Sequence, residues 1–89
     1  MAGEKVLACA EKKLIGKTLS NGEISFVVSE KFYKGNEITE RKLKKLLQEI
    51  GNVNLVGEKP VKIAMQLNLA EEKNILWIEN IPHIQIFRI

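Results

Sequence analysis

The segment N52-V-N-L-V-G-E-K-P-V-K-I-A-M-Q-L-N68 decides the architecture, because it contains a strand, a glycine break and a helix in immediate succession. Residues 52–56 are short and β-like, and Gly57 interrupts them. Pro60 suits the first turn of a helix, where its missing N–H is not needed, so we expect a helix from Pro60 to about Asn68. This helix is apolar around most of its circumference and is predicted to be mostly buried, with a polar strip of Lys62 and Gln66.

A second helix is predicted just before this segment. Thr39 is a suitable N-cap, because its hydroxyl can accept a hydrogen bond from the first turn, and Gly51 is a suitable end. The apolar residues between them form one stripe at helical spacing, namely Leu43, Leu46, Leu47 and Ile50. Basic residues lie opposite, so the spacing predicts an amphipathic helix with a basic outer face.

Strands are predicted on both sides of this central part. The apolar run Val6 to Ala10 predicts a strand over 5–11, and Asn21-Gly22 favours a type I′ turn that joins 17–20 to 23–29. We expect residues 30–36 to be an irregular connection, and 74–79 and 83–89 to be strands joined by Asn80-Ile81-Pro82. In the hairpin's second strand, the side chains predicted to be buried are Ile24, Phe26 and Val28.

The resulting order β-β-β-α-β-α-β-β predicts one small α+β domain over residues 1–89. We expect a mixed or antiparallel sheet with two helices on one face, and flexible residues 1–4. At 89 residues the chain is too short to enclose a large substrate or a deep cofactor cavity. No apolar run approaches the roughly 20 residues of a membrane span.

The residues that carry chemistry are few. Cys9 is the only cysteine and His83 the only histidine, so no internal disulfide can form and no spacing typical of a metal site occurs. We therefore predict no metal and no cofactor, identify no small-molecule substrate, and expect a reducing cytoplasm. Cys9 with His83 is the minimum for thiol catalysis, but Cys9 in an apolar strand is better interpreted as a small buried hydrophobe. His83 has either a structural or a functional role.

Gly16-Lys17-Thr18 is similar to the end of a phosphate-binding loop. The glycine that such a loop needs five residues earlier is replaced by Glu11, whose carboxylate would repel phosphate. The turn is also predicted to lie between strands instead of opening a helix. Nucleotide hydrolysis is therefore disfavoured.

Two groups of polar residues are candidates for binding. The basic helix face could contact nucleic-acid phosphates, although acidic neighbours also fit a merely solvated face; its candidates are Arg41, Lys42, Lys44 and Lys45. His83 and Gln85, two apart on one strand, project to the same side. With Lys17 and Thr18 they could form a polar patch that holds an anion or a partner backbone.

Several pieces occur in the order seen in a small archaeal family, the domain of unknown function numbered four hundred and twenty-four. They are Cys9 with Gly16-Lys17-Thr18, Phe32-Tyr33 with Gly35, Asn54-Leu55-Val56-Gly57, and Pro82-His83 with Gln85. The chain resembles this family from about Val6 to Arg88. It departs at Ala10, where the family often has an acidic residue, and mildly at Leu19 and Ile84. The resemblance implies a cytoplasmic archaeal protein associated with translation, and supplies no activity, cofactor or catalytic set.

We expect a non-enzymatic protein that binds RNA or ribosomal components through the basic helix face, because no complete catalytic constellation is present. One alternative is a protein-interaction module that forms a homo-oligomer through an edge strand such as 83–89. Another is a small enzyme that uses Cys9 or His83.

Overall fold

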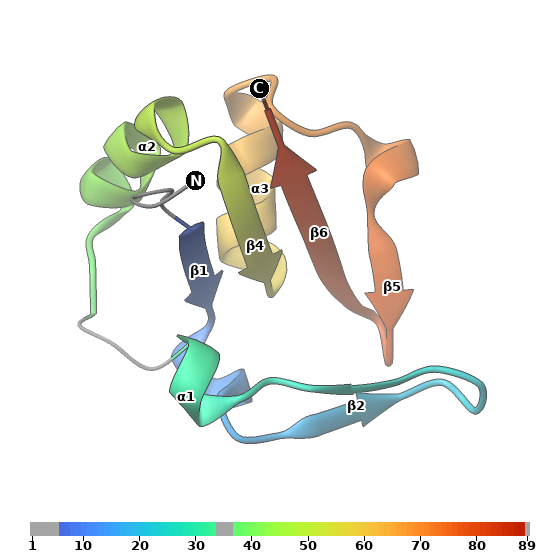
Figure 1. Cartoon of the computed structure of the whole chain (residues 1–89). Helices are drawn as coiled ribbons and strands as arrows, with labels where there is room; N and C mark the ends of the chain where they lie inside the picture. Colours follow the sequence, from blue (N-terminus) through green and yellow to red (C-terminus); the bar gives the residue numbers. More distant parts are fainter. Residues whose placement is uncertain (1–5, 34–36, 89) are drawn as a thin grey trace.

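A computed structural model of the chain describes residues 6–33 and 37–88 (Figure 1). A four-stranded sheet forms its centre, in the spatial order β1 (Val6–Ala10), β4 (Asn52–Val56), β6 (Ile81–Phe87) and β5 (Leu76–Ile78). β1 runs parallel to β4, and the other two pairs are antiparallel. The sheet is therefore mixed, which is one of the two predicted arrangements.

Two helices cover one face of this sheet: α2 (Glu40–Glu49) and α3 (Glu58–Gln66). Alternate residues of the strands meet them in a core whose fully or nearly buried members are Leu43, Leu47, Val53, Leu55, Val61, Ile63, Ala64, Ile84 and Ile86. The predicted placement of both helices on one face is confirmed, and so is the predicted order of strands and principal helices.

The opposite face is covered only in part. The hairpin of β2 (Thr18–Ser20) and β3 (Ser25–Val27) and the short helix α1 (Glu30–Tyr33) pack against one end of it. The second core formed there consists of Leu14, Leu19, Val28, Tyr33, Val56 and Ile78. The Ser20 N–H donates to Glu79 Oε2 at 2.6 Å, so the hairpin is also tied to the turn between β5 and β6.

Local interactions explain where the helices begin and end. Thr39 Oγ1 accepts a hydrogen bond from the Lys42 N–H at 3.1 Å, as predicted for the N-cap of α2. The Arg88 guanidinium donates to the carbonyls of Leu47 and Ile50, where a cation satisfies free carbonyls at the end of the helix. Arg88 thereby joins the end of β6 to the end of α2.

The start of α3 depends on Gly57 and on a distant carboxylate. Gly57 has φ 111° and ψ 159°, a conformation that is nearly restricted to glycine. Glu11 lies directly after β1, and its Oε1 accepts the Lys59 N–H at 3.2 Å. A phosphate-binding loop would have glycine at position 11, whereas this chain has a carboxylate that caps a helix. Gly16-Lys17-Thr18 leads into β2 instead of a helix.

Four predictions about the secondary structure are wrong. Asn21 does not have a positive φ and β2 joins β3 through the four residues 21–24, so the turn at Asn21-Gly22 is not of type I′. Residues 30–33 are helical; Gly35 and the rest of 34–36 lie outside the described residues, as do residues 1–4, for which flexibility was predicted. The β5–β6 turn is formed by Glu79 and Asn80 at φ 52° and 62°, so Pro82 lies inside β6 and is buried. Ile24 is 41% exposed because β3 begins one residue later, whereas Val28 is fully buried as predicted.

The edge role suggested for residues 83–89 is also wrong. β6 hydrogen-bonds to β4 on one side and to β5 on the other, so the edges of the described sheet are β1 and β5. This position explains why side chains on both faces of β6 are apolar. None of the described helices is long and apolar enough to cross a membrane.

Candidate functional site

The solvent face of α2 carries the predicted basic residues. Arg41, Lys42 and Lys45 are exposed, and none of them forms an ion pair with another described residue. Lys44 is half-buried and pairs with Glu40 one turn away, with 3.4 Å between Nζ and Oε2. With two acidic residues, Glu40 and Glu49, the ten-residue helix carries a net charge of +2. The structure thus places three free cations and one neutralised cation on one helix.

Lys12 and Lys13, which lie near α2, are less available for binding because carboxylates pair with them. Lys12 Nζ lies 2.7 Å from Glu37 Oε1, and the hydrogen bond and charge of this pair raise the pKa of Lys12 and lower that of Glu37. Lys13 Nζ lies 3.6 Å from Glu11 Oε2. The basic surface is therefore concentrated on α2 and does not extend as a continuous stripe onto residues 12 and 13.

Members of the predicted polar patch come from β6 and from the hairpin that packs against it. His83 and Gln85 do share a face of β6, opposite Ile84 and Ile86. The His83 ring stacks on Phe26 of β3 with 4.5 Å between ring centroids, and its Nε2 has no hydrogen-bond partner among the described residues. Burial lowers the pKa of His83, so the neutral ring is favoured. No hydrogen bond joins Lys17, Thr18, His83 and Gln85 within the described part of the chain.

Cys9 and His83 lie on opposite faces of the sheet. Cys9 is paired with Leu55 and packs toward α2 and α3, whereas His83 is paired with Val56 and faces the hairpin. A strand, β4, also separates them. Burial raises the pKa of the Cys9 thiol, which disfavours the thiolate. The two side chains therefore cannot form a nucleophile and base pair in this fold.

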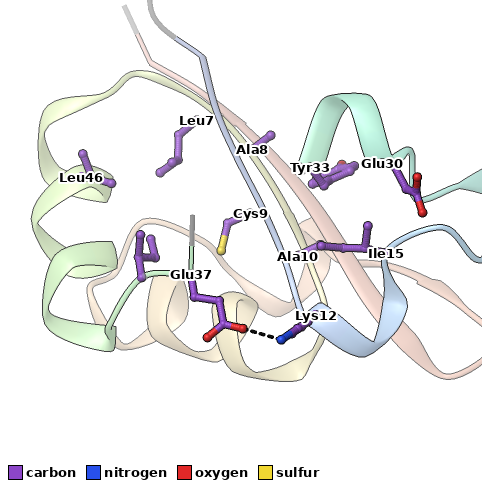
Figure 2. Close-up of a pocket in the computed structure, with 11 residues that line it drawn as sticks. Leu7, Ala8, Cys9, Ala10, Lys12, Ile15, Glu30, Tyr33, Glu37 and Leu46 are labelled. Atoms are coloured by element: carbon purple, nitrogen blue, oxygen red, sulfur yellow. Dashed lines mark ion pairs between the residues drawn. The ribbon is translucent and has the colours of Figure 1, made fainter. Parts of the chain in front are cut away.

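A cleft that the sequence did not indicate runs along the outer edge of β1 (Figure 2). It has a volume of about 910 Å³, and four consecutive strand residues, Leu7 to Ala10, line it. Figure 2 shows Leu7 and Cys9 on the side of α2 and Ala8 and Ala10 on the side of α1, so the cleft follows the strand's edge. Only the topology reveals this cleft, because it depends on β1 being an edge strand.

The described residues do not contain three His, Cys, Asp or Glu side chains grouped so that they could hold a metal ion. The features above define a small α+β domain with a mixed four-stranded sheet, two helices on one face and a partial cover on the other. The chain belongs to the family described as Protein of unknown function (DUF424), whose model matches residues 1–89.

A solved structure has the same fold: an uncharacterized conserved protein from Methanopyrus kandleri, with a TM-score of 0.72 and 26% sequence identity. The match covers 92% of this chain and 79% of that one. No curated protein matches the chain. The predicted membership of this family is thus confirmed, and the comparisons assign it no biochemical activity.

Proposed function

We propose that this protein is a non-enzymatic RNA-binding protein that contacts phosphates through the solvent face of α2. The observation that supports the proposal is the set of three exposed cations, Arg41, Lys42 and Lys45, that no described carboxylate neutralises. Lys44 contributes a fourth charge once a phosphate competes with Glu40. The separation of Cys9 from His83 removes the main reason to prefer an enzyme.

Binding of this kind depends on salt. Each phosphate that a cation neutralises releases condensed counterions, so affinity falls as salt rises and does not depend on base sequence. For four such contacts with single-stranded RNA, a rise from about 50 to 200 mM salt weakens binding by about 50-fold. A helix face with a net charge of +2 attracts RNA only moderately, so measurable binding is expected at low salt.

The test replaces Arg41, Lys42, Lys44 and Lys45 by glutamine in one variant. A matched control replaces Lys31, Lys59, Lys62 and Lys73, which lie on other elements and are also exposed, so both variants lose four charges. Fluorescence anisotropy with a labelled RNA duplex should show weaker binding and a flatter salt dependence for the α2 variant alone. Equal losses in the two variants would mean that only total charge matters, and the proposal would be wrong.

A second candidate is self-association through β1, which the cleft along its outer edge favours. An edge strand presents N–H and C=O groups that can pair with another strand. Sedimentation velocity of the wild type and of Ala8→Asp tests this candidate. A dimer that the substitution dissociates would support it, and a wild-type monomer at high concentration would contradict it.

A further inference from the structure

Within residues 6–33 and 37–88, only half of the face of the sheet opposite α2 and α3 is covered. Strand register places its side chains in rows across β1, β4 and β6, because paired residues on neighbouring strands point to the same side. The row that contains Ala10, Val56 and His83 lies against the hairpin, which crosses this end of the sheet in Figure 1. Two rows remain beyond it, in which only Ala8 packs against the second core. We name these rows the open half-face: Val6, Asn52, Phe87, Ala8, Asn54 and Gln85.

The open half-face combines one aromatic ring with three amide side chains. Phe87 is 62% exposed and Val6 is 49% exposed, at the two ends of the same row. Asn54 and Gln85 are paired across β4 and β6, and Gln85 is exposed. No described hydrogen bond uses the side chain of Asn52, Asn54 or Gln85, and Asn52 Oδ1 has no partner. Asn52 Oδ1 is buried, so the amides that a ligand can reach are those of Gln85, which is exposed, and Asn54, which is partly exposed.

This composition fits an unstacked nucleobase. An exposed aromatic ring on a sheet provides a stacking surface, and amides supply both a donor and an acceptor to the edges of a base. The six positions contain no carboxylate, so nothing on the open half-face repels an approaching polyanion. A purely hydrophobic partner would leave three amides without hydrogen bonds, which costs about 1–3 kcal/mol for each buried group.

The open half-face lies on the other side of the sheet from α2, but it ends where the chain leaves this helix. α2 leads through Ile50 and Gly51 directly into Asn52, and Figure 1 shows α2 beside this end of the sheet. Arg88, which follows Phe87, donates hydrogen bonds to the last turn of α2, and its own N–H donates to the Gly51 carbonyl at 2.7 Å. The backbone that carries Phe87 is thus tied to the last turn of α2 through a short, hydrogen-bonded connection, and a single strand that crosses this end of the sheet could contact both.

We propose that the open half-face binds unpaired bases of single-stranded RNA, with Phe87 as the stacking residue and Asn54 and Gln85 as hydrogen-bonding residues. This inference rests on the proposed RNA-binding function and adds a ligand class, since α2 alone would bind single strands and duplexes alike. The fold contains a natural control: Trp77 is 50% exposed, but it points to the opposite side of the sheet from Leu76 and His83.

The experiment measures the binding of a labelled single-stranded RNA and of a labelled RNA duplex to four proteins: wild type, Phe87→Ala, Trp77→Ala and the four-glutamine α2 variant. Phe87→Ala should weaken single-strand binding by about 5- to 150-fold, the usual contribution of one stacked base, and leave duplex binding unchanged. Trp77→Ala should change neither. Amide shifts in NMR titrations with the single strand should map to β4 and β6, and thermal unfolding should verify that each variant folds.

The outcomes separate this inference from the proposed function. Duplex binding that requires α2, together with single-strand binding unaffected by Phe87→Ala, would overturn the inference and retain the proposed function. Phe87-dependent single-strand binding without any role for α2 would support the inference and contradict the basic-face proposal. Absence of binding to either RNA would overturn both. If the wild type is a dimer that Phe87→Ala dissociates, a second copy covers this face and the inference is wrong.

Discussion

The two faces of the central sheet differ although the same strands supply them. On the face under α2 and α3, the alternate residues of β4 and β6 are all apolar and deeply buried. On the other face, the same strands carry His83, Gln85, Asn52 and Asn54, and the hairpin covers only one end. The first face stabilises the fold, and the second carries polar and aromatic side chains that are only partly covered. The period of two along a strand is what permits this division.

The largest difference in the loss of stability is expected between two neighbouring residues of β4. Leu55 is fully buried under the helices, so Leu55→Ala should destabilise the protein by about 2–5 kcal/mol through lost burial and a residual cavity. Asn54 faces the open half-face, and Asn54→Ala should change stability by no more than about 0.5 kcal/mol. Urea denaturation of both variants measures the difference. Similar losses would show that the two faces contribute equally to stability.

A smaller effect is expected where β4 turns into α3. A Cβ at residue 57 would lie 2.5 Å from Glu11 Cγ, and the backbone there favours glycine, so Gly57→Ala should cost about 1–3 kcal/mol. Adding Glu11→Ala removes the collision, but it leaves the backbone strain and also removes the hydrogen bond from the Lys59 N–H. Denaturation of the double variant should therefore recover only part of the loss. Full recovery would show that the collision accounts for the whole effect.

The hairpin-covered face should respond to acid through His83. Burial lowers the folded-state pKa of His83 below its ordinary value of 6.5, so the unfolded chain binds a proton more readily. Stability contributed by the neutral ring is present above about pH 6.5, decreases as pH falls through that value, and stops decreasing once the folded ring is also protonated.

Hydrogen exchange at pH 5 and 7.5 measures this effect locally. Protection in β2 and β3 should decrease at pH 5 more than protection in α3, since Phe26 stacks on His83. His83→Leu should remove the difference between hairpin and helix. An equal decrease in both elements of the wild type would contradict a specific role for the histidine.

Elements whose interactions are local in the sequence were predicted correctly, and elements that depend on distant contacts were not. The hairpin and α2 were predicted because their signals are local: Asn21-Gly22 near the turn, and Thr39 and Gly51 around the helix. The type of the turn was wrong, because four residues join the strands and Asn21 does not have a positive φ. α1 was missed because four residues of helix depend on tertiary contacts such as the burial of Tyr33. Pro82 was misplaced because the adjacent turn uses Glu79 and Asn80 at positive φ, without a glycine.

The candidate sites show the same difference between local patterns and distant contacts. The basic face of α2 follows from the helical period, and the shared side of His83 and Gln85 follows from the strand period. Each period can be seen within one segment of the sequence. The row of Val6, Asn52 and Phe87 requires the register between three strands that are distant in the sequence. The stacking of Phe26 on His83 also requires the hairpin to be docked, so the sequence alone placed His83 in an accessible patch.

The smallest expected effect concerns the ion pair between Lys12 and Glu37, which lines the cleft beside β1 (Figure 2). The hydrogen bond and charge of Lys12 lower the folded-state pKa of Glu37 below its ordinary value of 4.5. Any stability from this carboxylate is therefore present above pH 4.5 and lost as pH falls through the lowered pKa. Both side chains are exposed, so water and salt screen the pair and Lys12→Gln should leave the unfolding midpoint unchanged.

An NMR titration of Glu37 should show its pKa rising toward 4.5 in Lys12→Gln, with Lys13→Gln as the matched control. A Glu37 pKa that stays low in Lys12→Gln would mean that another group stabilises the carboxylate.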